Sequence, residues 1–333
     1  MKVAVTGAGG FLGRALVSRL AESGQKPLAV VKKEQDASVY EKNGIESVCR
    51  DLAEKETCGQ LFRDCDAVIH CAALRRDFGR WEDFKRTNID ITRLVMEYAA
   101  KAGVKKVIFV STVAVYGNDR NHFGTDEDAD YGERVVDYYT RSKIAADKIV
   151  ASLIKERNFP AVILRLGYIW GPGDQVVVPF VVRNLKSKRL FLADDGSNLL
   201  SLTYIDNAVE AIMLALKNEE ASGKVYNITD GSRVTSERFI YDIISILGLD
   251  YRPKRVGYPV LYMAAYLLEA YHRLSRRSTP PPLTRFTSRF LKYDAVFDIS
   301  RAIYDLGYQP KISYKEGMTL LTSYLRTLYY GGK

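Results

Sequence analysis

The stretch Lys2-Val3-Ala4-Val5-Thr6-Gly7-Ala8-Gly9-Gly10-Phe11-Leu12-Gly13 decides the fold of this 333-residue chain. It joins a short apolar strand, predicted over residues 2–6, to a helix predicted over residues 11–23. Glycines permit a tight turn and let backbone amides approach a pyrophosphate, and the helix N-terminus adds partial positive charge. The spacing is Gly-x-x-Gly-x-x-Gly, because Leu12 stands where the Gly-x-Gly-x-x-Gly fingerprint has its third glycine. The stretch predicts a dinucleotide-binding turn, with contacts from Gly7, Gly9, Gly10, Phe11, Leu12 and Gly13.

Short apolar strands alternate with helices through the first half of the chain. Such strands fit a parallel sheet buried on both faces, and the alternation predicts right-handed βαβ units. We therefore predict an α/β protein with a Rossmann-type, doubly wound parallel sheet. The predicted strands cover residues 2–6, 27–31, 45–49, 66–70, 106–111 and 161–165, and the longer predicted helices cover residues 11–23, 81–102 and 136–157.

The pattern changes after Gly171-Pro172-Gly173, beyond which helices mix with short strands and loops. We predict a dinucleotide-binding Rossmann domain over residues 1–170 and a mainly substrate-binding α+β lobe over residues 171–333. A segment near residues 200–230 is expected to return to the Rossmann sheet.

Composition limits the classes of partner. The net charge is +9, but the basic residues are scattered among acidic ones without an aromatic-basic repeat, so we do not expect nucleic-acid binding. The apolar run after Met1 is too short for a signal peptide, which favours a cytoplasmic protein. We interpret Cys49, Cys58, Cys65 and Cys71 as reduced thiols rather than a disulfide or zinc site. With His70, His122 and His272 as the only histidines, we expect no metal site.

The end of the second predicted strand bears on the choice of cofactor. It reads Ala29-Val30-Val31-Lys32-Lys33, and no carboxylate follows until Glu34. An acidic residue there would accept the ribose 2′-hydroxyl of NAD, whereas two ammonium groups suit a 2′-phosphate. We therefore favour NADP(H), with NAD(H) as the alternative. A different interpretation of the same residues is that Lys32 and Lys33 bind no phosphate and only make a surface loop soluble.

Three further strand ends carry residues suited to a cofactor or substrate. Asp51 and Leu52 follow the third strand, where an adenine edge would lie. Ala72 and Ala73 follow the fourth strand, where small side chains let the backbone pass close to the cofactor. Phe109-Val110-Ser111-Thr112 brings two hydroxyls to the carboxyl edge of the sheet, at which open α/β sheets bind ligands.

Tyr139 and Lys143 lie four residues apart in the helix predicted over residues 136–157, so they share one face. A phenol has a resting pKa near ~10 and is a poor base at neutral pH. A cation one turn away stabilises the phenolate and lowers that pKa. On the helix that follows the fifth strand of a dinucleotide-binding sheet, this pair indicates hydride-transfer chemistry.

Together these motifs resemble the extended short-chain dehydrogenase/reductase superfamily, of the NAD-dependent epimerase/dehydratase type, over nearly the whole chain. The resemblance also rests on Asn88 in Thr-Asn-Ile-Asp-Ile-Thr and on Val115-Tyr116-Gly117 after Thr112. It implies that Tyr139 is the catalytic acid/base and that Lys143 lowers its pKa and holds the nicotinamide ribose. It places Thr112 at the catalytic Ser/Thr position, with Ser111 beside it, and Asn88 as the brace of the site.

Later segments narrow the resemblance to one branch. Residues 165–174, 203–208 and 281–286 resemble 3β-hydroxysteroid and sterol-4α-carboxylate dehydrogenases and bacterial reductases of 2-alkyl-3-ketoalkanoic acids. The branch implies interconversion of a secondary hydroxyl and a ketone on a hydrophobic substrate. We also expect a homodimer. One alternative is a nucleotide-sugar epimerase or dehydratase that retains NAD. Another is a redox-sensing regulator, which would not need Thr112, Tyr139 and Lys143.

Residues 256–268 carry no charge and several large apolar side chains, and Arg273, Arg276 and Arg277 follow. The stretch is too short to span a bilayer, which takes ~20 apolar residues. Two interpretations stay open. The segment is either a lid helix packed on the core or, with the arginines through residue 277, a helix at a membrane surface.

Overall fold

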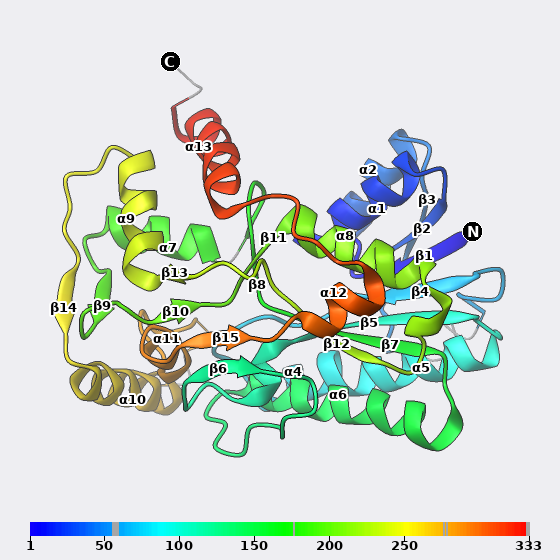
Figure 1. Ribbon diagram of the computed structural model, residues 1–333, viewed down its shortest axis with the longest axis horizontal. Coiled ribbons are helices and arrows are strands. Elements are labelled where there is room, and N and C mark those ends of the chain that lie inside the picture. The colour runs from blue at the N-terminus through cyan, green and yellow to red at the C-terminus, as the bar shows by residue number, and fades with distance from the viewer. Residues whose placement is uncertain (55–59, 176, 276, 278, 331–333) are drawn as a thin grey trace.

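A seven-stranded parallel sheet forms the centre of the computed structural model, which describes residues 1–54, 60–175, 177–275, 277 and 279–330 (Figure 1). Its strand order is β12-β7-β5-β4-β1-β2-β3. The order reverses between β1 and β4, as in a doubly wound sheet, so the predicted Rossmann-type fold is confirmed. The strands are β1 (Lys2–Thr6), β2 (Lys26–Val31), β3 (Glu46–Cys49), β4 (Ala67–His70), β5 (Lys106–Thr112), β7 (Ala161–Leu166) and β12 (Val225–Ile228).

Helices cover both faces of the sheet because alternate strand residues point to opposite sides. Val3 and Val5 pack in one apolar cluster, and Ala4 between them packs in another. The first cluster lies under α1 (Phe11–Glu22), α2 (Glu34–Lys42) and α8 (Ile205–Lys217), and the second under α5 (Ile91–Lys101) and α6 (Tyr138–Arg157) (Figure 1).

Two helices differ from the prediction. The helix expected over residues 81–102 is divided into α4 (Trp81–Phe84), a π-helical turn η1 (Lys85–Asp90) and α5. Helix α2 was not predicted, since it is mostly polar and buries only Ala37 and Tyr40.

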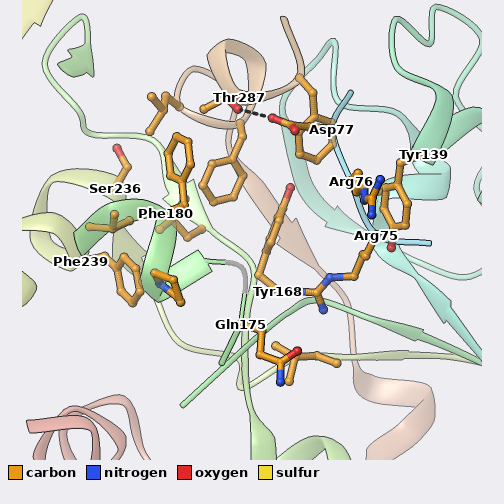
Figure 2. Close-up of a pocket in the computed structure, with 18 of the residues that line it drawn as sticks. Arg75, Arg76, Asp77, Tyr139, Tyr168, Gln175, Phe180, Ser236, Phe239 and Thr287 are labelled. Atoms are coloured by element: carbon orange, nitrogen blue, oxygen red, sulfur yellow. Dashed lines mark hydrogen bonds between the residues drawn. The ribbon is translucent and has the colours of Figure 1, made fainter. Parts of the chain in front are cut away.

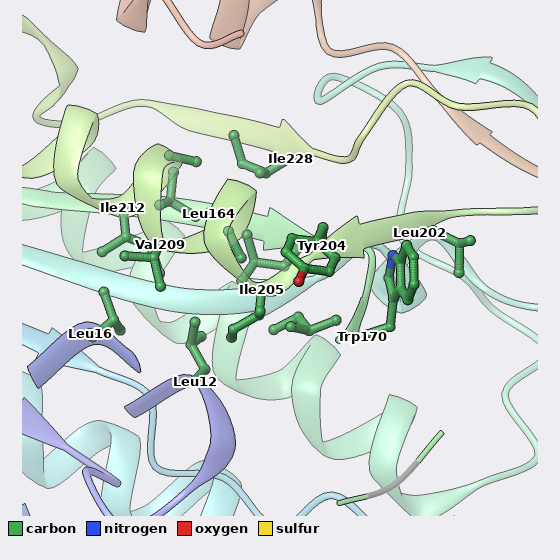
Figure 3. Packing of buried hydrophobic residues seen from close by; sticks show 14 of the residues in the cluster. Leu12, Leu16, Leu164, Trp170, Leu202, Tyr204, Ile205, Val209, Ile212 and Ile228 are labelled. Atoms are coloured by element: carbon green, nitrogen blue, oxygen red, sulfur yellow. The ribbon is translucent and has the colours of Figure 1, made fainter. Parts of the chain in front are cut away.

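The sheet layer also contains chain beyond residue 170. Strand β12 hydrogen-bonds to β7, and α8 packs against α1. In Figure 3, Leu12 and Leu16 of α1 lie opposite Val209 and Ile212 of α8, within one continuous apolar cluster. The segment 200–230 therefore contributes a helix and a strand to the layer that carries the glycine turn.

The second lobe consists of short strand pairs and helices. The pairs are β6 (His122–Thr125) with β15 (Ala295–Phe297), β8 (Tyr168–Trp170) with β11 (Leu202–Tyr204), β9 (Phe191–Ala193) with β14 (Lys254–Val256), and β10 (Leu199–Leu200) with β13 (Val234–Thr235). The helices are α7 (Val177–Lys186), α9 (Ser236–Ile246), α10 (Tyr258–Leu274), α11 (Arg285–Phe290), α12 (Ser300–Leu306) and α13 (Tyr314–Tyr330). None of the helices described here has the length and apolar content needed to cross a bilayer.

Candidate active site

The glycine turn is packed so tightly that side chains are excluded at two positions. Gly7 has φ +73°, and a Cβ atom there would lie 2.7 Å from the backbone nitrogen of Ala72. A Cβ atom on Gly13 would lie 2.2 Å from the carbonyl oxygen of Gly7. Helix α1 begins at Phe11 with no capping side chain and no acidic residue in its first turn. Its N-terminal amides and partial positive charge therefore fit a pyrophosphate.

The lysines after β2 and the acidic residue after β3 lie together. The Lys32 ammonium is 3.2 Å from an Asp51 carboxylate oxygen, and the Arg86 guanidinium is 3.1 Å from the same oxygen. Lys33 is the residue before the first turn of α2, and Leu52 is buried in the core. Part of the positive charge expected to meet a phosphate is thus paired with Asp51.

Arg14 and Asp36 also lie beside the glycine turn, and the sequence analysis missed both. Their side chains form an ion pair at 2.8 Å. A Cβ atom on Gly9 would lie 2.5 Å from the Asp36 carboxylate, so this carboxylate rests against the turn. Asp36 lies in the first turn of α2, and predicting that helix would have been the signal for it.

Asn88, in the π-helical turn, joins the loop after β4 to α6. Its side-chain oxygen accepts from the Leu74 amide at 2.6 Å, and its side-chain nitrogen donates to the Leu74 carbonyl at 3.1 Å. The same nitrogen donates to the Ser142 hydroxyl at 2.8 Å. Asn88 therefore holds the loop that starts with Ala72 and Ala73 against the helix that carries Tyr139.

Thr112 and Tyr139 meet in one cavity, and Ser111 does not reach it. Both Thr112 and Tyr139 line the cavity, and their hydroxyls are hydrogen-bonded. The Ser111 hydroxyl instead donates to Asp147 at 2.5 Å in the interior. Successive residues of a strand point to opposite faces, so only one of the two adjacent hydroxyls can face the substrate. The geometry favours Thr112.

The charges around Tyr139 include one, on Arg75, that was not predicted. Burial raises the pKa of Tyr139, while Arg75 and the hydrogen bond from Thr112 act to lower it. The Lys143 ammonium donates to the Val110 carbonyl at 2.8 Å, and burial lowers the pKa of Lys143 to about 8. Arg75 thus adds a second positive charge that acts to lower the pKa of Tyr139, and Lys143 is directed toward the end of β5.

A buried ion pair anchors α6 beneath these residues. Tyr139, Lys143 and Asp147 follow at intervals of four on one helix face. Arg165 of β7 contacts the two Asp147 carboxylate oxygens at 2.9 and 3.3 Å, and both side chains are almost fully buried. Asp147 also accepts from the Tyr131 hydroxyl at 2.8 Å. Strand β7 and the loop that carries Tyr131 thus fix the position of α6 against the sheet.

The cavity has a volume of about 430 Å³ and is apolar over most of its far wall (Figure 2). The loop after β4 supplies Arg75, Arg76 and Asp77 near Tyr139, and the Tyr168 ring lies 4.3 Å from the Phe290 ring. None of these residues was predicted as part of the site, because they come together only through the tertiary fold. The apolar lining comprises Ala114, Ile169, Pro179, Phe180, Val181, Leu190, Leu200, Phe239, Ile240, Pro280, Phe286, Phe290 and Leu291.

Helix α11, and not α10, forms a wall of the cavity within the part of the chain that is described. Thr284, which caps α11, donates to the Asp77 carboxylate at 2.9 Å, so α11 is attached to the loop after β4. Helix α10 supports α11 from outside, through Glu269 and Arg285 at 2.9 Å. Arg276 lies outside the described residues.

Among the cysteines and histidines, Cys71 and His70 lie near Lys143, at the end of β4. Cys49, Cys65 and Cys71 are free thiols, and Cys58 lies outside the described residues. His70 is buried between Thr6 and Thr92, and burial lowers its pKa to about 3. Across residues 1–54, 60–175, 177–275, 277 and 279–330, no group of three or more His, Cys, Asp or Glu is arranged to hold a metal ion.

Comparison with known proteins agrees with the predicted resemblance. The model of the NAD dependent epimerase/dehydratase family matches residues 3–229. A 2-alkyl-3-oxoalkanoate reductase from Stenotrophomonas maltophilia (strain K279a) is 30% identical, over 96% of this chain and 98% of the relative. A decarboxylating sterol-4-alpha-carboxylate 3-dehydrogenase from Dictyostelium discoideum is 25% identical, over 95% of this chain and 98% of the relative.

Solved structures share the fold over the full length. The UDP-glucuronic acid 4-epimerase from Bacillus cereus, in complex with UDP-glucuronic acid and NAD, superposes with a TM-score of 0.79. It is 22% identical, and the superposition covers 99% of this chain and 100% of that one. The matching family, the relatives and the glycine turn lead to one conclusion: the chain belongs to the NAD-dependent epimerase/dehydratase family and is a pyridine-nucleotide-binding enzyme of the extended short-chain dehydrogenase/reductase type.

Proposed function

We propose that this enzyme interconverts a ketone and a secondary hydroxyl group on a hydrophobic substrate, with Tyr139 as acid/base. The observation that carries the proposal is the apolar cavity of about 430 Å³ that opens beside Thr112 and Tyr139. Pockets for lipid-like molecules are lined mainly by apolar side chains, with few polar groups that fix orientation.

Each polar residue has a distinct role in this proposal. Reduction of a ketone adds a hydride to the carbonyl carbon and a proton to its oxygen. Tyr139 donates that proton, and Thr112 donates a hydrogen bond to the same oxygen. A bound nicotinamide supplies or accepts the hydride. Lys143 holds the nicotinamide ribose, and Asn88 keeps the loop after β4 in place.

The apolar lining and the relatives favour this function over a nucleotide-sugar epimerase. A sugar nucleotide presents a diphosphate and hydroxyls, whereas most of the side chains that line the cavity are aliphatic or aromatic, with Gln175, Arg183 and Ser236 among them. The relatives named as a 2-alkyl-3-oxoalkanoate reductase and a sterol-4-alpha-carboxylate 3-dehydrogenase act on hydrophobic carboxylic acids.

The two functions are separated by their cofactor balance. We expect the purified protein to oxidise NADPH stoichiometrically when given a 2-alkyl-3-oxoalkanoate, and to carry no tightly bound NAD. An epimerase would purify with NAD and convert UDP-glucose or UDP-glucuronic acid without net oxidation. That second result would overturn the proposal.

We also propose that the cofactor is NADP(H). Lys32, Lys33 and Arg14 place three cations around the adenosine end of the glycine turn, although Asp51 and Asp36 pair with two of them. A 2′-phosphate would compete for these cations, whereas an unphosphorylated ribose would not.

A third part of the proposal is that α10 rests on an anionic membrane surface. Six large side chains of α10 are at least half exposed, and five of them follow helical spacing along one face. They are Val260, Met263, Leu267, Tyr271 and Leu274 on that face, with Tyr266 beside it. Arg277 packs on the exposed Tyr271 ring, close to this face. The buried face of α10 contacts α11, which lines the cavity, so a helix resting on a membrane would lie one element away from the substrate site. The cytoplasmic location and the homodimer stay predictions.

A further inference from the structure

We infer that Arg75 binds a carboxylate of the substrate next to the reacting carbon, so that this site selects 3-oxo or 3-hydroxy acids over neutral ketones and alcohols. The inference rests on the proposed reductase function and names the residue that would set its substrate class.

Arg75 is a partly buried cation without an anionic partner. It lines the cavity, and among the described residues its guanidinium makes no hydrogen bond or ion pair. A guanidinium removed from water is costly unless an anion or acceptors satisfy it. Asp77 lines the same cavity but forms no ion pair with Arg75, so the Arg75 guanidinium lacks a direct anionic partner among the described residues.

The nearby carboxylates are committed elsewhere. Asp77 accepts from Thr284 at 2.9 Å and from Thr287 at 3.3 Å, on the side of α11 (Figure 2). Asp137 is buried at the start of α6 and accepts from the Thr140 amide at 2.7 Å. Neither carboxylate is within ion-pair distance of Arg75.

Arg75 lies close to the reacting position. It lowers the pKa of both Tyr139 and Tyr168, so its charge is near both phenols. In Figure 2 its side chain extends from the side of Tyr139 toward Tyr168. One substrate molecule can therefore place its oxygen on Tyr139 and an anionic group on Arg75, as a 3-oxo acid would. Arginine suits this anion because its planar fork can bind both carboxylate oxygens.

Other arginines in the cavity are less suited to this role. Arg76 and Arg183 line it but are exposed to solvent, where an ion pair contributes little. The carboxylate is therefore assigned to Arg75, and the apolar far wall is left for the alkyl chains.

The test compares an acid with its methyl ester in Arg75→Gln, Arg75→Lys and a control variant. Arg80→Gln is the matched control: Arg80 is on the same loop, its side chain is 78% exposed, and it does not line the cavity. Steady-state rates are measured with a 2-alkyl-3-oxoalkanoate and its methyl ester. Calorimetric Kd values are measured with the corresponding 3-hydroxy acid and its ester in the presence of NADPH, a combination that cannot transfer a hydride. Thermal unfolding checks that each variant is folded.

We expect Arg75→Gln to raise KM and Kd for the acid by ~10- to 100-fold, the range for a lost hydrogen bond to a charged group. KM and Kd for the ester should change by less than about two-fold. Any change in kcat should be the same for acid and ester, because loss of the Arg75 charge near Tyr139 affects both substrates alike. Arg75→Lys should restore part of the acid affinity, and Arg80→Gln should match the unmodified protein.

The outcomes separate this inference from the proposed function. If Arg75→Gln weakens the binding of acid and ester equally, or weakens neither, Arg75 does not bind the carboxylate. The reductase function would still stand. If acid binding depends on Arg75 but no variant oxidises NADPH, the anion site stands and the reductase function fails. Binding of UDP-glucose that depends on Arg75 would assign the arginine to a diphosphate and overturn the inference.

Discussion

Tyr139 is a half-buried phenol whose surroundings favour its protonated form. Burial raises its pKa, and Arg75 and Thr112 only partly offset that increase. A phenol that keeps its proton at neutral pH is suited to donate it to a ketone oxygen. In the proposed reduction Tyr139 therefore starts with the proton that it donates, and in the reverse direction it accepts that proton.

Replacing Tyr139 by Phe should lower kcat by ~10²-fold or more, because the positioned proton donor is lost. The Kd for NADPH should change by no more than a few-fold, since the phenol ring stays in place. Steady-state rates and cofactor titration measure the two effects. Retention of most of the activity would remove Tyr139 from the proposed mechanism.

Lys143 should make cofactor binding depend on pH. Its pKa is lowered to about 8 by burial, so the ammonium is lost as pH rises above this value. We expect the Kd for NADPH to rise between about pH 7 and pH 9. Arginine stays charged throughout this range, so Lys143→Arg should remove the dependence. Fluorescence titrations at several pH values measure it, and identical profiles for the two proteins would contradict the prediction.

The same pKa has a defined effect on stability. An unfolded lysine keeps its proton up to about pH 10.5, whereas folded Lys143 loses it near pH 8. Between these values the unfolded state binds more protons, so the contribution of Lys143 to the free energy of unfolding increases with pH.

Lys32 is expected to select the phosphorylated cofactor. Lys32→Asp should weaken NADPH binding and leave NADH binding nearly unchanged, because a carboxylate repels the 2′-phosphate. Lys32→Gln removes the charge without adding repulsion and should have a smaller effect. Kd values for both cofactors test the prediction. Equal Kd values for NADPH and NADH in the unmodified protein would rule out the preference itself.

At the scale of elements, the position of α6 depends on the buried pair of Asp147 and Arg165. Asp147→Ala leaves the Arg165 guanidinium buried without its carboxylate, and should lower the free energy of unfolding by ~3–5 kcal/mol. Urea unfolding measures this change. Glu97→Ala, which removes an exposed i,i+4 pair with Lys101, is the matched control and should cost ~0.3–0.5 kcal/mol. Similar losses for both variants would mean that α6 is held by packing alone.

Helix α10 should bring the protein to anionic vesicles. We expect co-sedimentation with phosphatidylserine-containing liposomes at low salt and its loss at high salt, since cations contribute to the attraction. Leu267→Glu should weaken binding, because it places a charge on the exposed apolar face. Leu328→Glu on α13 is the control, since Leu328 is 57% exposed and Leu267 is 60% exposed. Protein that stays in the supernatant with anionic vesicles would leave α10 as a support for α11 only.

At the scale of the whole molecule, the site lies where the sheet layer meets the second lobe. The loop after β4, strand β5 and α6 supply the polar groups, while α7, α9 and α11 supply the apolar wall. Strand β12 and helix α8 return to the sheet after the chain has entered the second lobe. The chain therefore passes from the sheet layer into the second lobe and back, and residues of both parts form the cavity.

Local sequence determined the sheet and the glycine turn. The central strands are buried on both faces and therefore read as short apolar runs, and the positions of Gly7 and Gly13 follow from contacts in which a Cβ atom has no room. The constraint on Gly13 is local, since it meets Gly7 within the turn, whereas Gly7 also meets Ala72 after β4. The i,i+4 spacing of Tyr139 and Lys143 is equally local, because it depends only on helix geometry.

Tertiary structure alone decided which hydroxyl faces the cavity, which cation lies near Tyr139 and what forms the substrate wall. Ser111 and Thr112 are adjacent in sequence, but the Ser111 hydroxyl donates to Asp147 of the buried ion pair. Arg75 and Phe290 are over two hundred positions apart, yet they line one cavity. Such contacts depend on how the second lobe packs on the sheet. The local pattern therefore predicted the cofactor turn and the acid/base pair, while the charge and shape of the substrate site arose only from long-range packing.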